Sequence, residues 1–201
     1  MEFSDVVVQK LTAPLTALLG ACVGGMFTLV ATNRVMHMDN EKEIRREEKE
    51  VQNLLDAIGM EIGTLWDFHQ RRIGAIIEVL PEGKALEFYY PLTQDYFTIY
   101  NSNATMIGRV KDASLREAIV VCYNKCKKVV DGFKYNNMLF RDYRDLLLMP
   151  ADSPNHVEYV KAKHNELFEF AQVIKEDHFE VKGYVERLLY LLNNRAASSD
   201  S

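Results

Sequence analysis

The chain has 201 residues and a formal net charge of −5 at pH 7, from 24 Lys or Arg and 29 Asp or Glu. This acidic balance gives no electrostatic reason to expect a nucleic-acid partner. The three cysteines, an odd number without a regular spacing, argue against a disulfide-stapled extracellular module.

Residues 11–33 contain no charged side chain. As an α-helix this run would be about 34 Å long, enough to cross the hydrocarbon core of a bilayer. A cleaved signal peptide is disfavoured, because Glu2 and Asp5 precede the first lysine and the apolar run is long for a secretion signal. The sequence therefore predicts a retained transmembrane helix at 11–33 that follows a short N-terminus, residues 1–10.

Lipidation of Cys22 stays open as an alternative, because Leu19-Gly20-Ala21-Cys22 has the shape of a lipoprotein box. The sequence from Val23 to Ala31 continues apolar, however, whereas a lipidated terminus normally enters polar sequence.

Basic residues predict the orientation of this helix. Only Lys10 precedes it, whereas several lysines and arginines follow within about fifteen residues. This predicts that the short N-terminus, residues 1–10, is extracytoplasmic and that the C-terminal side lies in the cytoplasm. The basic residues that follow are Arg34, Lys42, Arg45, Arg46 and Lys49.

Small residues inside the predicted span lie at helical spacing, which lets two membrane helices approach closely and suggests self-association. This helix-association face consists of Ala17, Gly20, Ala21, Gly24 and Gly25.

Residues 34–50 read as a charged helical stalk, in which Glu41 with Arg45 and Arg46 with Glu50 have stabilising four-residue spacing. An apolar seam then predicts that the helix continues until Pro81-Glu82-Gly83 ends it. The seam consists of Ile44, Val51, Leu55, Ile58, Ile62, Leu65, His69, Ile73, Ile76, Ile77 and Leu80.

Residues 84–110 are irregular and rich in aromatic side chains. They predict a connecting segment and a short helix from near Asp95 to before Gly108. The rings either plug the open end of a helical bundle or form a surface for a protein partner. The aromatic residues in question are Phe88, Tyr89, Tyr90, Tyr96, Phe97 and Tyr100.

A second long helix is predicted from a capping box, Ser114 with Glu117, to Met149 before Pro150. Asp131-Gly132 and Asn136-Asn137 are positions where it could bend. One apolar face consists of Leu115, Ile119, Cys122, Cys126, Val129, Phe133, Phe140 and Leu147.

A third helix is predicted to begin at Ser153, as cap, and Pro154. Its seam keeps a 3.5-residue period over five heptads, which indicates coiled-coil-like packing. The seam consists of Val157, Val160, His164, Leu167, Ala171, Ile174, His178, Val181, Val185, Leu188 and Leu192. Residues 196–201 are small and polar, and we expect a disordered tail.

The predicted fold is all-α. One N-terminal transmembrane helix continues into an antiparallel bundle of three long helices plus one short helix, with the bundle spanning residues 51–195.

Two groups of side chains could carry chemistry. Cys122 and Cys126 share a helix face, but both occupy seam positions, so core packing is favoured over a metal site. His69, His164 and His178 also lie in seams. They are either polar seam residues satisfied by hydrogen bonds, or a pH-sensitive or metal-binding cluster.

No phosphate-binding loop, nucleophile elbow or HExxH motif occurs in the sequence. We therefore expect no enzymatic activity, no cofactor, no resident metal and no small-molecule substrate.

The stretch from Tyr96 to Val110, an aromatic-to-Asn-to-Ile-Gly segment, precedes a helix that reaches Tyr123. It resembles a segment of uncharacterised bacterial single-pass membrane-anchored helical-domain proteins. The resemblance covers roughly thirty residues and the overall layout. It implies a bacterial inner-membrane setting with a cytoplasmic helical domain, and it implies no activity and no functional residue.

The sequence thus predicts a non-enzymatic, membrane-tethered interaction or regulatory module that contacts a protein partner or a second copy. The alternative is a self-assembling membrane effector that perturbs the bilayer.

Overall fold

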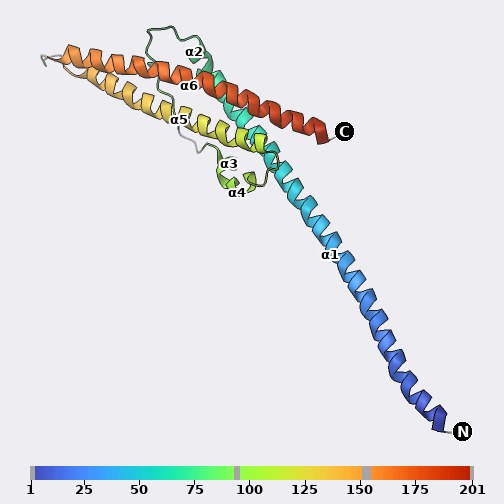
Figure 1. Cartoon of the computed structure of the whole chain (residues 1–201). Coiled ribbons are helices and arrows are strands. Elements are labelled where there is room, and N and C mark those ends of the chain that lie inside the picture. The colour runs from blue at the N-terminus through green and yellow to red at the C-terminus, as the bar shows by residue number, and fades with distance from the viewer. Residues whose placement is uncertain (1–2, 93–95, 151–154, 200–201) are drawn as a thin grey trace. The chain divides into compact units, whose positions relative to one another are not determined.

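The computed structural model describes residues 3–92, 96–150 and 155–199, and it describes side chains from residue 32 to residue 195 within these ranges. Every regular element in them is a helix, which confirms the predicted all-α class (Figure 1). The chain divides into two compact units, residues 1–50 and 51–201.

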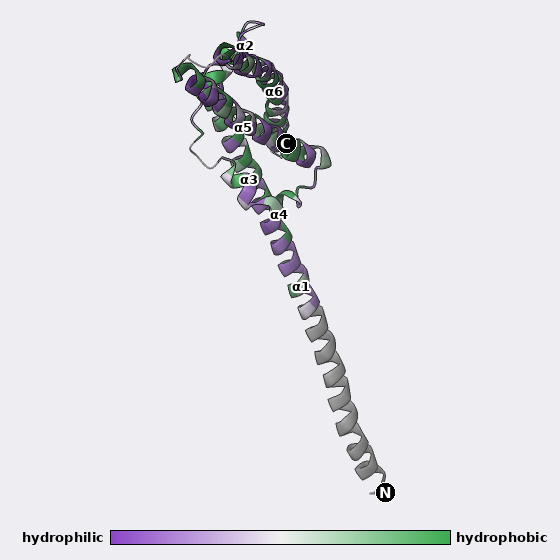
Figure 2. Ribbon diagram, turned by 90° about the vertical axis from the view of Figure 1, so that its left-hand side faces the viewer, coloured by the Kyte–Doolittle hydropathy of each residue, from purple (hydrophilic) through white to green (hydrophobic). Residues whose placement is uncertain are grey.

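The first unit belongs to helix α1, which runs from Phe3 to His69. Its described side chains are exposed and mostly hydrophilic up to residue 49 (Figure 2). The two predicted charge pairs form, with Arg45 Nη2 3.4 Å from Glu41 Oε2 and Arg46 Nε 3.0 Å from Glu50 Oε1. Ile44 is exposed, so its assignment to the apolar seam was wrong.

No helix in the described part of the chain has an apolar stretch long enough to cross a membrane. Of the predicted span, residues 11–33, only residues 32 and 33 have described side chains. The helix-association face, Ala17, Gly20, Ala21, Gly24 and Gly25, and also Cys22, therefore lie outside the described side chains.

In the second unit, α1 passes into a π-helical turn, η1 (Gln70–Gly74), and then into α2 (Ala75–Glu78). The helix thus ends just before Pro81, close to the predicted position, but the π turn was not predicted. Ile76, which the sequence placed on the seam, is exposed, while Ile73 and Ile77 are fully buried.

The two other long helices are α5 (Ala113–Leu148) and α6 (His156–Ser199), which lie side by side and run antiparallel (Figure 1). Helix α5 continues without a break through Asp131-Gly132 and Asn136-Asn137. It starts two residues earlier than predicted, because Asp112 rather than Ser114 caps it. The Asp112 carboxylate accepts hydrogen bonds from the backbone N–H groups of Ser114 and Leu115, at 2.8 and 3.1 Å.

The third predicted helix corresponds to α6, and only part of its predicted bounds is described. The predicted cap of α6, Ser153 with Pro154, lies outside the described residues. Helix α6 extends to Ser199, so the tail predicted to be disordered, residues 196–201, is helical as far as it is described.

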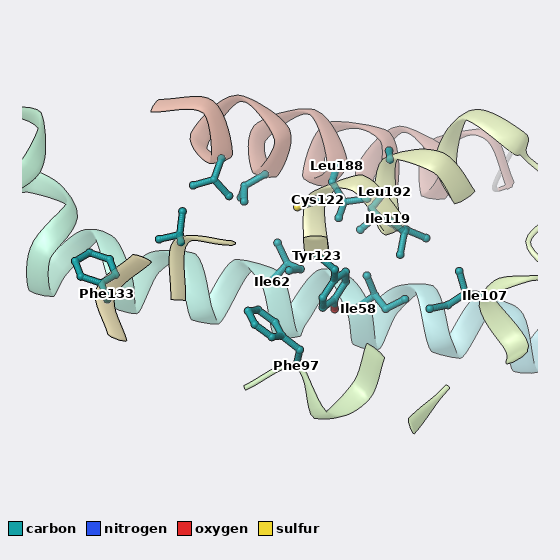
Figure 3. Close-up of a cluster of buried hydrophobic side chains, with 14 of the residues drawn as sticks. Ile58, Ile62, Phe97, Ile107, Ile119, Cys122, Tyr123, Phe133, Leu188 and Leu192 are labelled. Carbon is teal, nitrogen blue, oxygen red and sulfur yellow. The ribbon is translucent and has the colours of Figure 1, made fainter. Parts of the chain in front are cut away.

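One apolar core joins α1, α5 and α6 in the second unit. Ile58 and Ile62 of α1, Ile119 and Tyr123 of α5, and Leu188 of α6 are almost completely buried in it (Figure 3). The α6 seam is buried from Leu167 to Leu192 at every predicted position. Its first position, Val157, is exposed instead, as is Leu147 near the end of the α5 seam.

The segment between α2 and α5 contains two short helices, α3 (Thr98–Ser102) and α4 (Ala104–Ile107), where one short helix was predicted. Ile107 and Val110 bury their side chains in the core. The segment therefore packs as part of the second unit.

Candidate functional site

The aromatic segment does not form one exposed surface. Tyr90 and Phe97 are buried in the core, and Tyr96 and Tyr100 are partly buried against it. Of the six aromatic residues predicted as a partner surface, only Phe88 and Tyr89 are exposed. The structure thus favours the alternative in which most of these rings plug the bundle.

Two adjacent asparagines of α5 hold the extended part of this segment. The Asn137 side chain accepts a hydrogen bond from the Tyr90 backbone N–H at 2.8 Å and donates one to the Tyr90 carbonyl at 2.6 Å. The fully buried Asn136 amide donates to the carbonyls of Leu86 and Phe88, both at 3.2 Å. Because an extended segment has no ladder of its own, these side chains satisfy its backbone groups.

Glu61 of α1 anchors the start of α3. Its carboxylate accepts hydrogen bonds from the backbone N–H groups of Ile99 and Tyr100, at 2.8 and 3.3 Å. It also accepts one from the Tyr123 hydroxyl at 2.7 Å. A carboxylate at a helix N-terminus satisfies backbone donors that have no partner within the helix. Phe97, just before α3, has a left-handed backbone with φ of 67°, an uncommon conformation that these contacts help to hold.

The rings around this anchor pack closely. Tyr100 stacks on Tyr123 with centroids 4.1 Å apart, and Phe97 meets Tyr123 edge-on at 5.6 Å. Burial, followed by the hydrogen bond to Glu61, raises the pKa of Tyr123, so its hydroxyl stays protonated and remains a donor.

Beneath the aromatic segment lies a pocket of about 70 Å³ whose surface is almost entirely apolar. Helix α1, the aromatic segment, α5 and α6 all contribute to it, and none of the described residues that line it is Lys, Arg, Asp or Glu. Protein interiors contain few voids larger than a water molecule, so this space is a candidate binding site. Among its lining residues are Trp66, His69, Phe97, Val129, Phe133 and Val181.

A second, more polar recess of about 250 Å³ adjoins the pocket. The two share Leu92, Tyr96, Phe97 and Val130. Beyond this shared rim the recess is lined by Lys127, Asp131 and Lys134 of α5.

Two of the three seam histidines, His69 and His178, contact each other next to the pocket. His69 Nε2, at the end of α1, lies 3.1 Å from Nδ1 of His178 in α6. His178 is fully buried, and its Nε2 lies 3.3 Å from Glu78 Oε1 in α2. His164 does not join them, because it lies 3.4 Å from Glu87 and packs near Tyr143.

The polarity of this chain of hydrogen bonds follows from Glu78. An ionised carboxylate only accepts, so His178 donates from Nε2, and the Nδ1 of a neutral imidazole is then an acceptor. His69 therefore donates from Nε2 to His178. The Glu78 carboxylate also accepts from Lys182 Nζ at 2.8 Å and from Gln70 Nε2 at 2.9 Å.

These surroundings shift the pKa values of all three groups. Burial, with a contribution from His178, lowers the pKa of His69 to about 4. Burial also lowers the pKa of His178, against the opposing effect of Glu78. The hydrogen bond from Lys182, followed by those from Gln70 and His178, lowers the pKa of Glu78 to about 2. At neutral pH the arrangement is a pair of neutral imidazoles next to an ion pair.

The cysteine pair packs in the core. Cys122 is fully buried, and a hydrogen bond with Cys126 together with burial raises the pKa of its thiol. This favours the core-packing interpretation. Among the described residues, no three His, Cys, Asp or Glu side chains are grouped so that they could hold a metal ion.

The joined ends of α5 and α6 carry large apolar side chains that the bundle does not cover, and we call these residues the hairpin end. Leu148 is 77% exposed and Val157 is 62% exposed. The hairpin end consists of Leu147, Leu148, Met149, Val157 and Tyr159.

Sequence reasoning missed Glu61, Trp66, Glu78 and Asn137. Each is a single residue on a helix, without a spacing pattern. The irregular, aromatic-rich segment indicated that side chains elsewhere must bind its backbone N–H and C=O groups, but it did not identify which ones.

No protein-family model matches the chain, and searches of curated proteins and of solved structures returned no similar protein. The resemblance to bacterial membrane-anchored helical-domain proteins therefore stays a prediction.

Proposed function

We propose that the protein is a non-enzymatic, membrane-tethered interaction module. Residues 11–33 anchor it in the bacterial inner membrane, and the unit formed by residues 51–201 contacts a second copy of the chain through the hairpin end. The uncharged run at 11–33 supports the anchor, and the exposed apolar residues of the hairpin end support the contact.

The single observation that carries the proposal is the exposure of seam residues in the hairpin end. Leu147 and Val157 continue the apolar seams of α5 and α6, whose other members are mostly buried. An apolar seam of this kind normally packs against a neighbouring helix. Within the described residues, α2 ends at Glu78 and leaves Leu147 and Val157 exposed. A second hairpin end offers a matching apolar seam, and a two-fold contact would bury both.

The charges near the hairpin end are compatible with this pairing. Arg141 and Asp142 are adjacent on α5, with Nη2 and Oδ1 3.5 Å apart, and Arg144 and Asp145 repeat the combination. Because both signs alternate, two copies need not repel each other.

Several polar side chains in residues 51–201 bind backbone groups of the same unit, which supports a structural rather than an enzymatic role. Glu61, Asn136 and Asn137 hold backbone groups of the aromatic segment. Lys175 likewise donates to the Leu80 carbonyl at 2.6 Å. These groups are engaged in structural contacts.

Crosslinking in native membranes tests the contact. We expect a crosslinked species of twice the chain mass in the wild type, and its loss in Leu148→Glu, which places a charge in the hairpin end. Val79→Glu is the matched control, because Val79 is equally exposed but lies outside the hairpin end. A dimer that persists in Leu148→Glu, or a product that contains only a different protein, would contradict pairing through this surface.

Membrane tethering requires a separate test. We expect the intact chain to sediment with membranes and to resist extraction at alkaline pH, and a C-terminal reporter to be active in the cytoplasm. A chain that stays in the supernatant, or a reporter that is active only outside the cytoplasm, would overturn the tether.

A further inference from the structure

The apolar pocket and the polar recess adjoin each other. Leu92, Tyr96, Phe97 and Val130 line both spaces, so a ligand that occupies both passes along these four side chains. The two parts differ in chemistry, since the inner pocket is nearly all apolar and the recess is half polar. A ligand that fills both must itself have an apolar end and a polar end.

The inner pocket accepts only an uncharged, apolar group. Among the described residues, no Lys, Arg, Asp or Glu side chain lines it, and its one lining histidine, His69, is neutral at pH 7. Trp66, Phe97 and Phe133 supply aromatic surface around it. An engineered apolar cavity of roughly 150 Å³ holds a benzene molecule. With about 70 Å³, this pocket has room for one alkyl chain end or for part of a ring, and not for the paired chains of a membrane lipid.

The recess favours an anion. Lys125 and Lys128 of the same helix pair with Glu180 and Asp177, at 2.5 and 2.6 Å. Lys127 instead donates to the uncharged side-chain oxygen of Asn101 at 3.0 Å, and its ammonium lies 4.9 Å from the Tyr100 ring centroid. Neither of these partners neutralises its charge.

The other two charges of the recess largely cancel. Lys134 Nζ lies 2.8 Å from Asp131 Oδ1. Of the described residues that line the recess, Lys127, Asp131 and Lys134 are charged, and together they carry a net charge of +1.

We propose that the apolar pocket and the adjoining recess together bind a small amphiphilic carboxylate. A single alkyl chain enters the apolar pocket below the aromatic segment, and the carboxylate lies in the recess beside Lys127. This site is separate from the hairpin end, and it goes beyond the proposed contact between copies and does not depend on it.

The chain carries its own probe, because Trp66 is its single tryptophan and lines the pocket. The full chain in detergent-free nanodiscs is titrated with a terminally brominated decanoate, whose bromine quenches indole fluorescence on contact. The matching brominated decanol has the same chain without the charge. We expect saturable quenching by the carboxylate, with weaker binding of the alcohol.

Two substitutions separate the parts of the site. Lys127→Gln should weaken carboxylate binding by about two- to fivefold, as expected for a partly exposed ion pair, and leave alcohol binding unchanged. Val129→Phe should fill the pocket and abolish saturable quenching by both compounds. The matched controls are Lys128→Gln, outside the recess, and Val120→Phe on the exposed face of α5, and both should bind like the wild type.

Three outcomes would overturn the proposal. Quenching that rises linearly in the wild type, as for an amphiphile that only partitions into the nanodisc, would exclude a defined site. Equal saturable quenching in Val129→Phe would place the site elsewhere. Unchanged carboxylate affinity in Lys127→Gln would exclude recognition of the anion by the recess, and this test does not depend on how the larger Val129→Phe side chain affects folding.

Discussion

His69 Nε2 lies 3.1 Å from His178 Nδ1, although 109 residues separate the two histidines along the chain. Because His178 accepts from His69 at Nδ1 and donates its single N–H, at Nε2, to Glu78, these contacts join the ends of α1 and α2 to the middle of α6. Trp66 packs against both imidazoles, with ring centroids 5.2 and 5.5 Å from theirs. The pair is thus a partly buried polar contact between helices of a largely apolar core.

Stability should fall as the pH is lowered through the range in which an unfolded histidine takes up a proton. The pKa of His69 is about 4 in the folded chain, against 6.5 for an unperturbed histidine. Between these values the unfolded chain binds more protons, so the free energy of unfolding rises with pH from about 4 to 6.5 and is constant above. The loss from pH 7 to pH 4 should approach about 3 kcal/mol. The lowered pKa of His178 acts in the same direction.

Urea unfolding of the full chain at pH 7, 6, 5 and 4.5 measures this dependence. Glu78, with a pKa of about 2 in the folded chain and 4.5 when unperturbed, acts in the same direction, but only at the lower end of this range. We expect His69→Gln to show a smaller slope than the wild type. His164→Gln, which changes a histidine that does not contact the pair, should keep the wild-type slope. Equal slopes in all three proteins would show that the pair does not set the pH dependence.

The sequence was sufficient to place His69 and His178 in apolar seams, because each falls at the three- or four-residue spacing of its neighbours. It was not sufficient to predict their contact. That contact depends on how far α6 is shifted along α1. The π turn Gln70–Gly74 changes the helical phase of the residues that follow, and so affects the position of Glu78, the third member of the arrangement. His164 occupies an equally good seam position, two heptads away, and its partner is Glu87 instead.

The same limit explains the residues that were predicted wrongly. A 3.5-residue period identifies an apolar face but not the element that covers it, so Val157 and Leu167 look alike in the sequence. In the structure Leu167 is completely buried by other parts of the bundle, whereas Val157 is exposed. In the aromatic segment the period itself is missing. Tyr90 and Phe97 lie in an irregular stretch, so no spacing pattern indicates which rings are buried.

The bond between Glu61 and Tyr123 should contribute measurably to stability. Tyr123→Phe removes the hydroxyl donor, and Glu61→Gln presents an amide group to donors that need an acceptor. Hydrogen bonds to charged groups contribute about 1.5–3 kcal/mol, so each single change should lower the free energy of unfolding by about that amount. In urea unfolding, the double variant should lose clearly less than the sum of the two single losses.

Tyr135→Phe is the matched control for this pair. Its hydroxyl donates to Glu166 at 3.2 Å on the surface, so we expect a loss below about 0.5 kcal/mol. Strictly additive losses in the Glu61 and Tyr123 cycle would mean that the two side chains do not interact in solution.

Asn137→Ala should release the extended segment at Tyr90. The substitution removes one bond accepted from the Tyr90 N–H and one donated to its carbonyl, and both backbone groups are partly buried. We expect a loss of about 1–3 kcal/mol and faster hydrogen exchange at the Tyr90 amide. Asn124→Ala, at an exposed position of the same helix, should not lower the free energy of unfolding and should leave exchange at Tyr90 unchanged. Unchanged exchange at Tyr90 in Asn137→Ala would show that the amide is protected by other contacts.

Two glycines should respond in opposite ways to substitution by alanine. At Gly74, in the π turn, an added Cβ would lie 2.2 Å from Gln70 Oε1 and 3.1 Å from His178 Cε1. Gln70 can rotate away, but it would then lose its bond to Glu78, and His178 is held by its own contacts. At Gly183, in α6, no atom outside the local helix backbone lies within 4 Å of the added Cβ.

Gly74→Ala should therefore lower the free energy of unfolding by about 1–2 kcal/mol, as expected for overpacking in a filled site. Gly183→Ala should raise it by about 0.5–1 kcal/mol, because alanine favours the helix over the unfolded chain. Both variants are compared with the wild type by urea unfolding at pH 7. Should Gly74→Ala prove as stabilising as Gly183→Ala, His178 and Gln70 could not be packed against the π turn as closely as described, and the histidine pair would lack the rigid support that holds its two rings together.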